Sequence, residues 1–307
     1  MLFAKTSLIL ATTFLLVNTH GAGPLDNKNV SVIMAEPSPT PQKGMDTTNG
    51  DIKVLAEGSH SEVTSPFLAV VRDEQVYARL RKLATGLPEL QEDFFKRRAV
   101  IAAFMGERNT GGYRVEITRA ADDSIHLAAM SPPGDAMVAQ VITTPFKVVA
   151  VPTNRSLALE ADSNWQKAMR SYHITSGQFS ISGGFAGRTE QFALDGGIRV
   201  MREGELVTFL FDLKSVDVEK PRSLKESATG LVDDDSIVVP RIGAGSLVEV
   251  PHGDLSVTGS FTDKKSKLAL SFISLPTMIA DGYGGGGSIE AQAGTPQPQK
   301  KQLVKNQ

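Results

Sequence analysis

The hydrophobic pattern is clearest between residues 99 and 117. An apolar run at 99–105 is followed by a polar turn at 106–112, and then by a run in which apolar and polar residues alternate. A continuous apolar run favours a buried strand, and alternation favours a strand with one exposed face. The turn contains three glycines, which can adopt the positive φ angles that tight turns require: Gly106, Gly111 and Gly112. The pattern therefore predicts a β-hairpin with a structural glycine turn.

A strand and a helix are expected before this hairpin. Residues 67–72 form a short apolar run, and the segment 74–84 repeats apolar residues at the spacing of one helical face. Asp73 is placed to cap the start of the helix, and Gly86 is placed to end it. The pattern thus predicts one helix between two strands.

Two more strands are expected after the hairpin, at 124–130 and at 138–151. Together these elements predict that residues 53–153 form an α+β domain, an antiparallel sheet with one helix. Residues 154–167 are largely polar and are expected to connect this domain to the next one.

An all-β domain is expected at residues 168–276. Apolar residues alternate along several segments between glycine-rich turns, and at 206–213 both faces of the strand are largely apolar. Such a strand is typical of the centre of a sandwich or of a barrel, and the sandwich is the preferred interpretation. A barrel could enclose a small apolar ligand, which is a second functional hypothesis. Residues 277–307 are expected to form a disordered tail.

The N-terminus predicts export. Lys5 precedes an apolar run that ends at Val17 and is too short to span a bilayer comfortably, and small and polar residues follow it. This pattern is typical of a signal peptide at residues 1–21, with cleavage after Gly21; an uncleaved N-terminal anchor is the alternative. Residues 22–52 are rich in Asn, Thr, Gly and Pro, and are expected to form a flexible linker.

Composition narrows the functional class. The 307 residues are 41% hydrophobic, which allows one or two domains with substantial cores. The 32 basic and 34 acidic residues lack large single-sign blocks, which argues against nucleic acid as a partner. The chain has no cysteine, so it has no disulfide, no thiol nucleophile and no acceptor for a lipid anchor. No later apolar stretch approaches transmembrane length, so we expect a soluble periplasmic or secreted protein.

Three motifs, taken in order, resemble the PrcB C-terminal domain family. They are Pro88 with Asp93-Phe94, the turn Gly106-Glu-Arg-Asn-Thr-Gly-Gly-Tyr113, and the turn Ser131-Pro-Pro-Gly134 ahead of Thr144-Pro-Phe-Lys-Val-Val149. Proteins of this family are accessory proteins associated with the stability of a secreted protease complex. Over residues 53–153, the resemblance implies an exported, non-enzymatic protein that binds and stabilises another exported protein, with a protease as the expected partner. Some family members are lipoproteins, and this chain departs from that pattern because it lacks cysteine.

The glycine-rich turn offers candidate partner-binding residues. Arg108, Asn109 and Thr110 are expected at an exposed loop tip, where partner contacts often occur, and Tyr113 begins the next strand beside them. Arginine and aromatic residues are enriched in protein interfaces. An anion site is the alternative, but the turn lacks the ending of a P-loop and leads into a strand instead of a helix.

No catalytic set, metal site or cofactor site is recognised. Four histidines follow the predicted signal peptide, and none belongs to a metal-binding array: His60, His126, His173 and His252. The chain has no Gly-x-Ser-x-Gly elbow, and the acidic run Asp233-Asp-Asp235 lacks the spacing of a calcium loop. A hydrolase that assembles its residues from distant strands is the third hypothesis.

Overall fold

The computed structural model describes residues 51–153, 157–183, 188–216, 218–247, 253–275 and 283–294, and all of them belong to one compact unit. The predicted signal peptide and nearly all of the predicted linker lie outside the described residues, and so does His252. Within the described residues, no helix has the length and apolar character needed to cross a membrane.

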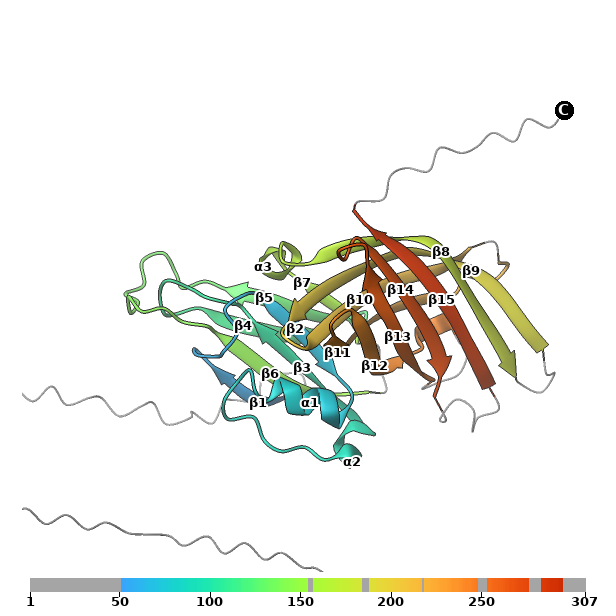
Figure 1. Ribbon diagram of the computed structural model, residues 1–307. Helices are drawn as coiled ribbons and strands as arrows, with labels where there is room; N and C mark the ends of the chain where they lie inside the picture. Colours follow the sequence, from blue (N-terminus) through green and yellow to red (C-terminus); the bar gives the residue numbers. More distant parts are fainter. Residues whose placement is uncertain are drawn as a thin grey trace, which may run out of the picture. The chain divides into compact units, whose positions relative to one another are not determined.

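The first part of the structure consists of two small sheets and short helices (Figure 1). Its strands are β1 (Lys53–Gly58), β2 (Phe67–Val71), β3 (Arg98–Phe104), β4 (Arg114–Arg119), β5 (Ile125–Met130), β6 (Phe146–Pro152) and β7 (Leu159–Ala161). Its helices are α1 (Glu74–Leu80), α2 (Glu92–Phe95) and α3 (Ser163–Gln166). One sheet is antiparallel with the order β1-β6-β3-β2, and the other has the order β4-β5-β7, with β5 and β7 parallel. The α+β prediction is confirmed, although the described residues hold two short helices beyond the one expected.

The predicted hairpin at 99–117 is wrong. β3 pairs with β2 and β6, whereas β4 pairs with β5 in the other sheet. The segment 106–112 is therefore a crossover between two sheets. Both strands have the expected hydrophobic pattern, but that pattern does not specify the neighbour of a strand, and here distant strands supply better pairing than the adjacent one.

Helix α1 begins as the sequence predicts. The Oδ1 atom of Asp73 accepts hydrogen bonds from the backbone N–H groups of Gln75, at 2.8 Å, and Val76, at 3.2 Å. These bonds satisfy donors that have no partner inside the helix. The helix ends earlier than expected, at Leu80, so Gly86 is not its cap, although Gly86 does have a positive φ of 82°.

The second part is a closed eight-stranded barrel (Figure 1). Its strands are β8 (Arg170–Gly183), β9 (Arg188–Glu203), β10 (Leu206–Val216), β11 (Ser223–Asp233), β12 (Ser236–Gly243), β13 (Asp254–Thr262), β14 (Lys267–Ser274) and β15 (Tyr283–Ala293), with a 3₁₀ turn at Gly245–Leu247. β15 pairs with both β14 and β8 and so closes the barrel. The structure thus has a barrel in place of the preferred sandwich. The acidic run at 233–235 forms the exposed turn between β11 and β12.

Strand β15 (Tyr283–Ala293) corrects part of the prediction of a disordered tail at 277–307, and residues 277–282 and 295–307 of that prediction lie outside the described residues. The segment 284–287 is entirely glycine, which weakens any strand pattern in the sequence. The barrel explains these glycines, because a Cβ atom at Gly287 would lie 2.2 Å from the carbonyl oxygen of Gln178 and 2.8 Å from the ring of Phe179. Close approach of the backbone of β8, together with the ring of Phe179, thus requires glycine at this position of β15.

Aromatic side chains fill the barrel interior. The ring of Phe179 stacks on Phe192 with centroids 5.8 Å apart and meets the edge of Phe272 at 6.4 Å. Phe211 packs against Phe272 at 5.9 Å and against Phe209 at 5.7 Å. These side chains are buried, so aromatic packing supplies a large share of the core of the barrel.

Polar side chains of the barrel complete the edge of the first sheet. β2 is an edge strand, yet its Val70 N–H donates to Thr229 Oγ1 at 2.7 Å, and its Leu68 carbonyl accepts from Thr208 Oγ1 at 2.6 Å. The two threonine hydroxyls are 2.8 Å apart and also share a hydrogen bond. Two backbone groups that β2 would otherwise expose at the sheet edge are therefore hydrogen-bonded by side chains of barrel strands β10 and β11.

Candidate functional site

The predicted partner-binding turn is half of a pair of loops. Residues 106–113 lie beside residues 131–145, and we call these two segments the paired loops. Arg108 N–H donates to the Thr143 carbonyl at 2.8 Å, and Thr143 N–H donates back to the Arg108 carbonyl at 2.9 Å. Gly111 N–H donates to the Ala139 carbonyl at 2.9 Å. These backbone bonds fix the shape of both loops.

Two of the three predicted glycines have the conformation that glycine favours. Gly106 has φ = 74°, and a Cβ atom there would lie 2.8 Å from backbone atoms of residues 64–66. Gly112 has φ = 85°, and its Cβ would lie 3.0 Å from side-chain atoms of Pro132 and Val138. Gly111 is not in the positive-φ region, and a Cβ there would make ordinary contact with Ala139 at 3.6 Å. The structural role is thus carried by Gly106 and Gly112.

Arg108 is half-buried and is not at an exposed tip. Its Nη2 donates to the Oδ1 of Asn164 in α3, and its guanidinium lies over the ring of Tyr113, 5.7 Å from the ring centre. Tyr113 and Thr110 are also half-buried, whereas Asn109 is exposed. The structure therefore brings Arg108 and Tyr113 into contact, and Asn164 of α3 holds the Arg108 side chain in place.

Helix α3 is itself firmly positioned. Asp162 caps it by accepting from Asn164 N–H at 2.8 Å, and the other carboxylate oxygen accepts from Ala129 N–H in β5 at 2.6 Å. The fully buried Trp165 donates its indole N–H to the Phe104 carbonyl at 2.8 Å. The helix thus connects both small sheets to the side chain of Arg108.

The paired loops also expose apolar side chains that the hydrophobic pattern does not predict to be exposed. Met137 is fully exposed, Ile142 is 62% exposed and Val141 is 51% exposed. The hydrophobic pattern predicts one strand over residues 138–151, but β6 begins only at Phe146. A signal was present, because Pro132, Pro133 and Gly134 start a loop in which apolar residues have no strand partner. The missed patch lies on the loop that pairs with the predicted turn.

A charged cleft lies between the second small sheet and the barrel. It has a volume of about 750 Å³ and is lined by residues of both parts of the structure. The carboxylate of Glu160 in β7 accepts from Lys225 Nζ in β11 at 2.8 Å and lies 3.0 Å from His126 Nε2 in β5. The hydrogen bond to Glu160 raises the pKa of Lys225 above its ordinary value. Sequence reasoning could not find this cleft, because its residues come from strands far apart in the chain.

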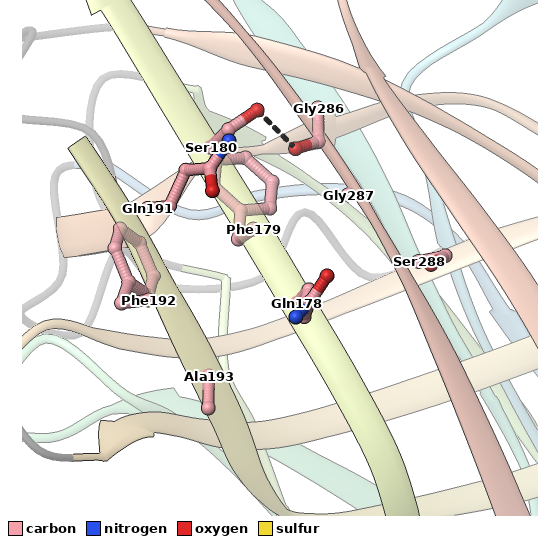
Figure 2. Close-up of a pocket in the computed structure, with 9 residues that line it drawn as sticks. All are labelled: Gln178, Phe179, Ser180, Gln191, Phe192, Ala193, Gly286, Gly287 and Ser288. Atoms are coloured by element: carbon pink, nitrogen blue, oxygen red, sulfur yellow. Dashed lines mark hydrogen bonds between the residues drawn. The ribbon is translucent and has the colours of Figure 1, made fainter. Parts of the chain in front are cut away.

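A second pocket, of about 410 Å³, lies in the barrel wall where β8, β9 and β15 meet (Figure 2). Gln178 and Gln191 line it together with Ser288 and Ser180, whose hydroxyl donates to the Gly286 carbonyl at 3.3 Å. Amides and hydroxyls suit a polar ligand. Phe179, Phe192 and Ala193 also line the pocket, so it offers both polar and apolar contacts, and the second hypothesis stays a prediction.

The three histidines that the structure describes do not assemble into one site. His126 pairs with Glu160, His173 lies in β8, and His60 is exposed in the first part of the structure. Among the described residues, no group of three or more His, Asp or Glu side chains is arranged to hold a metal ion.

Comparison with known proteins gives a family match over part of the chain. The family described as PrcB C-terminal matches residues 99–152, which confirms the resemblance for that stretch. The match includes both paired loops and the strands β3 to β6, whereas Pro88, Asp93 and Phe94 lie outside it. No curated protein has significant sequence similarity to this chain.

Two similar solved structures are mutants of the vaccine antigen Transferrin Binding Protein B (TbpB) from Haemophilus parasuis Hp5. The double mutant has 11% identity and a TM-score of 0.31, over 82% of this chain and 42% of that chain. A single mutant has 10% identity and a TM-score of 0.30, over 62% of this chain and 39% of that chain. This chain thus spans less than half the length of either protein.

Proposed function

We propose that this chain is a non-enzymatic accessory protein that binds another protein through the paired loops. The observation that carries the proposal is the exposure of Met137, Val141 and Ile142 on a loop whose backbone is fixed by hydrogen bonds. Exposed apolar side chains cost free energy in water, and a grouped set of them is typical of an interaction site. Burying them against a partner recovers that free energy.

The rigid setting of these side chains supports the same proposal. Ordering a loop on binding reduces affinity, and a loop that is already ordered avoids this cost. The backbone bonds of Arg108 and Gly111 hold the apolar loop before any partner arrives. The stacked pair of Arg108 and Tyr113 adds residue types that frequently dominate binding energy.

The proposed partner is an exported protein, with a protease as the first candidate. The export signal predicted at residues 1–21 supports the compartment, and the family match over 99–152 supports the accessory role. This match covers the paired loops, the same part of the chain that carries the exposed apolar side chains.

Affinity capture from the exported fraction of the native host would test the proposal. The mature chain is immobilised, and the recovered proteins are quantified by mass spectrometry for the wild type and for Ile142→Ser combined with Met137→Ser. The matched control is Ile273→Ser, because Ile273 on the barrel is 58% exposed, close to the 62% of Ile142. We expect the loop variant to lose a specific exported protein that the control retains.

Two results would count against this function. One is that no exported protein is recovered by the wild type above the level of an unrelated matrix. The other is that the loop variant and Ile273→Ser retain or lose the same proteins equally. Thermal unfolding of each variant confirms that the substitutions at these exposed positions leave the fold intact.

A further inference from the structure

The charged cleft between the small sheet and the barrel has charged side chains that form no hydrogen bond within the described residues. Glu116 in β4, Arg199 in β9 and Asp212 in β10 all line it. Within the described part of the chain, none of these three side chains forms a hydrogen bond or an ion pair. They come from strands of both parts of the structure. Asp212 lies opposite Lys225 in the β10–β11 pairing and helps to raise the pKa of that lysine through its charge, but it forms no hydrogen bond or ion pair with it in the described residues. One cleft thus gathers charges of both signs whose hydrogen-bonding capacity is unused.

The other charged groups of the cleft are already engaged. Glu160 binds Lys225 and His126, and both oxygens of Asp162 accept backbone N–H groups. These contacts shape the two walls and hold them at their present separation. The ligand-binding capacity therefore lies with Glu116, Arg199 and Asp212 at the same cleft.

The chemistry of these three groups selects the ligand. Two carboxylates favour a cation, and a guanidinium favours a carbonyl or carboxylate oxygen. An anion would be repelled by the carboxylates, and a purely apolar ligand would bury charges without partners, at a high cost in free energy. A peptide supplies both a basic side chain and a row of main-chain carbonyl oxygens. A cleft where two parts of a protein meet is also a common position for a ligand.

We propose that this cleft binds an extended peptide segment carrying a basic side chain, which interacts with Glu116 and Asp212 while Arg199 binds a main-chain carbonyl. The inference does not depend on the paired loops. A peptide in the cleft and a protein on the loops are separate contacts, and each can be lost without the other.

Nuclear magnetic resonance titration of the mature chain tests this proposal with three end-blocked heptapeptides. They have the sequence Gly-Ala-Gly-X-Gly-Ala-Gly, where X is lysine, glutamate or methionine, and the blocked ends remove terminal charges. We expect saturable shifts of backbone amides in β4, β7 and β10 with the lysine peptide, and much weaker shifts with the other two. Spermidine serves as a flexible cation without carbonyl groups.

Two carboxamide variants and a matched control locate the binding. Glu116→Gln and Asp212→Asn should each weaken the lysine peptide about threefold, and the double variant about tenfold, as expected for partly exposed ion pairs. Asp233→Asn, at the exposed turn between β11 and β12, should have no effect. Added salt should weaken binding of the lysine peptide to the wild type.

The proposal is overturned if the lysine peptide gives no saturable shift at millimolar concentration, or if all three peptides bind equally. It is also overturned if spermidine reproduces the same shifts with equal affinity, since the site would then attract any cation. Loss of peptide binding with intact capture of an exported protein would refute this inference alone and leave the proposed function in place.

Discussion

Arg72 and Glu226 form a buried ion pair that joins the first sheet to the barrel. Arg72 follows the last residue of β2, its Nη2 contacts Oε1 of Glu226 in β11, and both side chains are almost completely buried. Glu226 also accepts from Leu157 N–H at 3.0 Å, and Arg72 lies 3.9 Å from Asp254, which in turn pairs with Arg241 at 2.6 Å. The interface therefore contains a charge-balanced network shielded from water.

Removing one member of this pair should strongly destabilise the protein. Arg72→Met leaves the Glu226 carboxylate buried without its cation, and Glu226→Gln leaves the guanidinium with a weaker partner, so we expect losses of about 3 kcal/mol for each. The double variant should lose less than the sum, because it removes both charges together. Urea denaturation followed by circular dichroism measures all three. Additive losses would show that the pair is not energetically coupled.

Gly106 and Gly111, both in the crossover segment 106–112, should respond differently to substitution by alanine. At Gly106 a methyl group meets backbone atoms at 2.8 Å and the φ angle is positive, so Gly106→Ala should cost more than about 2 kcal/mol. Gly111→Ala meets only Ala139 at 3.6 Å, so its stability should stay within about 0.5 kcal/mol of the wild type. Thermal unfolding of the two variants makes the comparison. Equal losses would contradict the roles assigned to these glycines.

The sequence predicted local features and failed where distant strands decide the structure. Asp73 caps its helix because capping depends on the next three residues, which the sequence displays directly. The hairpin at 99–117 failed because β3 takes its partners from residues 67–71 and 146–152, far away in the chain. A strand pattern indicates a buried face, and it does not indicate which strand lies next to it.

The same limit applies to the site. Arg108 and Tyr113, both predicted as partner-binding residues, contact each other because they lie on one short loop. Asn164, which anchors Arg108, lies more than fifty positions later and could not be identified from spacing. The glycine run at 284–287 hid the strand that closes the barrel, since only the close approach of the neighbouring strands β8 and β14 explains these glycines.

The stability of the protein should fall above pH 10 because the hydroxyl of Tyr77 ionises more readily in the unfolded chain. This side chain is almost fully buried, and its hydroxyl donates to the Pro88 carbonyl at 2.9 Å. Burial raises the pKa of Tyr77, while the nearby charge of Arg81 opposes the change. Because the folded pKa lies above the ordinary value of 10.0, the unfolded chain releases this proton first as the pH rises. Its contribution is thus complete below pH 10 and is lost as the pH passes the folded pKa.

Tyr77→Phe isolates that effect. The variant should be about 1 kcal/mol less stable at pH 7, because it loses one buried hydrogen bond. The difference from the wild type should shrink as the pH rises above 10, because phenylalanine has no proton to release. Urea denaturation at pH 7, 9 and 10.5 measures this difference in stability. The titration of Tyr172 and of the lysines does not affect the difference, because both proteins contain these residues. A difference that stays constant over this range would show that Tyr77 does not titrate on unfolding.

Arg108 should contribute to stability as well as to binding, because its guanidinium connects the paired loops to α3. Arg108→Ala removes the bond to Asn164 and the contact with Tyr113, and should cost about 1 kcal/mol. Asn164→Ala should cost a similar amount, and a double-mutant cycle should show that the two losses overlap, since they remove one shared bond.

Fluorescence of the sole tryptophan gives a convenient measurement of the stability of these variants. Trp165 is the only tryptophan in the chain, it is fully buried next to Asn164, and its emission reports unfolding of α3 directly. Partner capture should fall for Arg108→Ala and remain for Asn164→Ala if Arg108 contacts the partner itself. If both variants lose the partner equally, Arg108 acts by holding the loops in place, and the contact with the partner belongs to the exposed side chains of Met137, Val141 and Ile142.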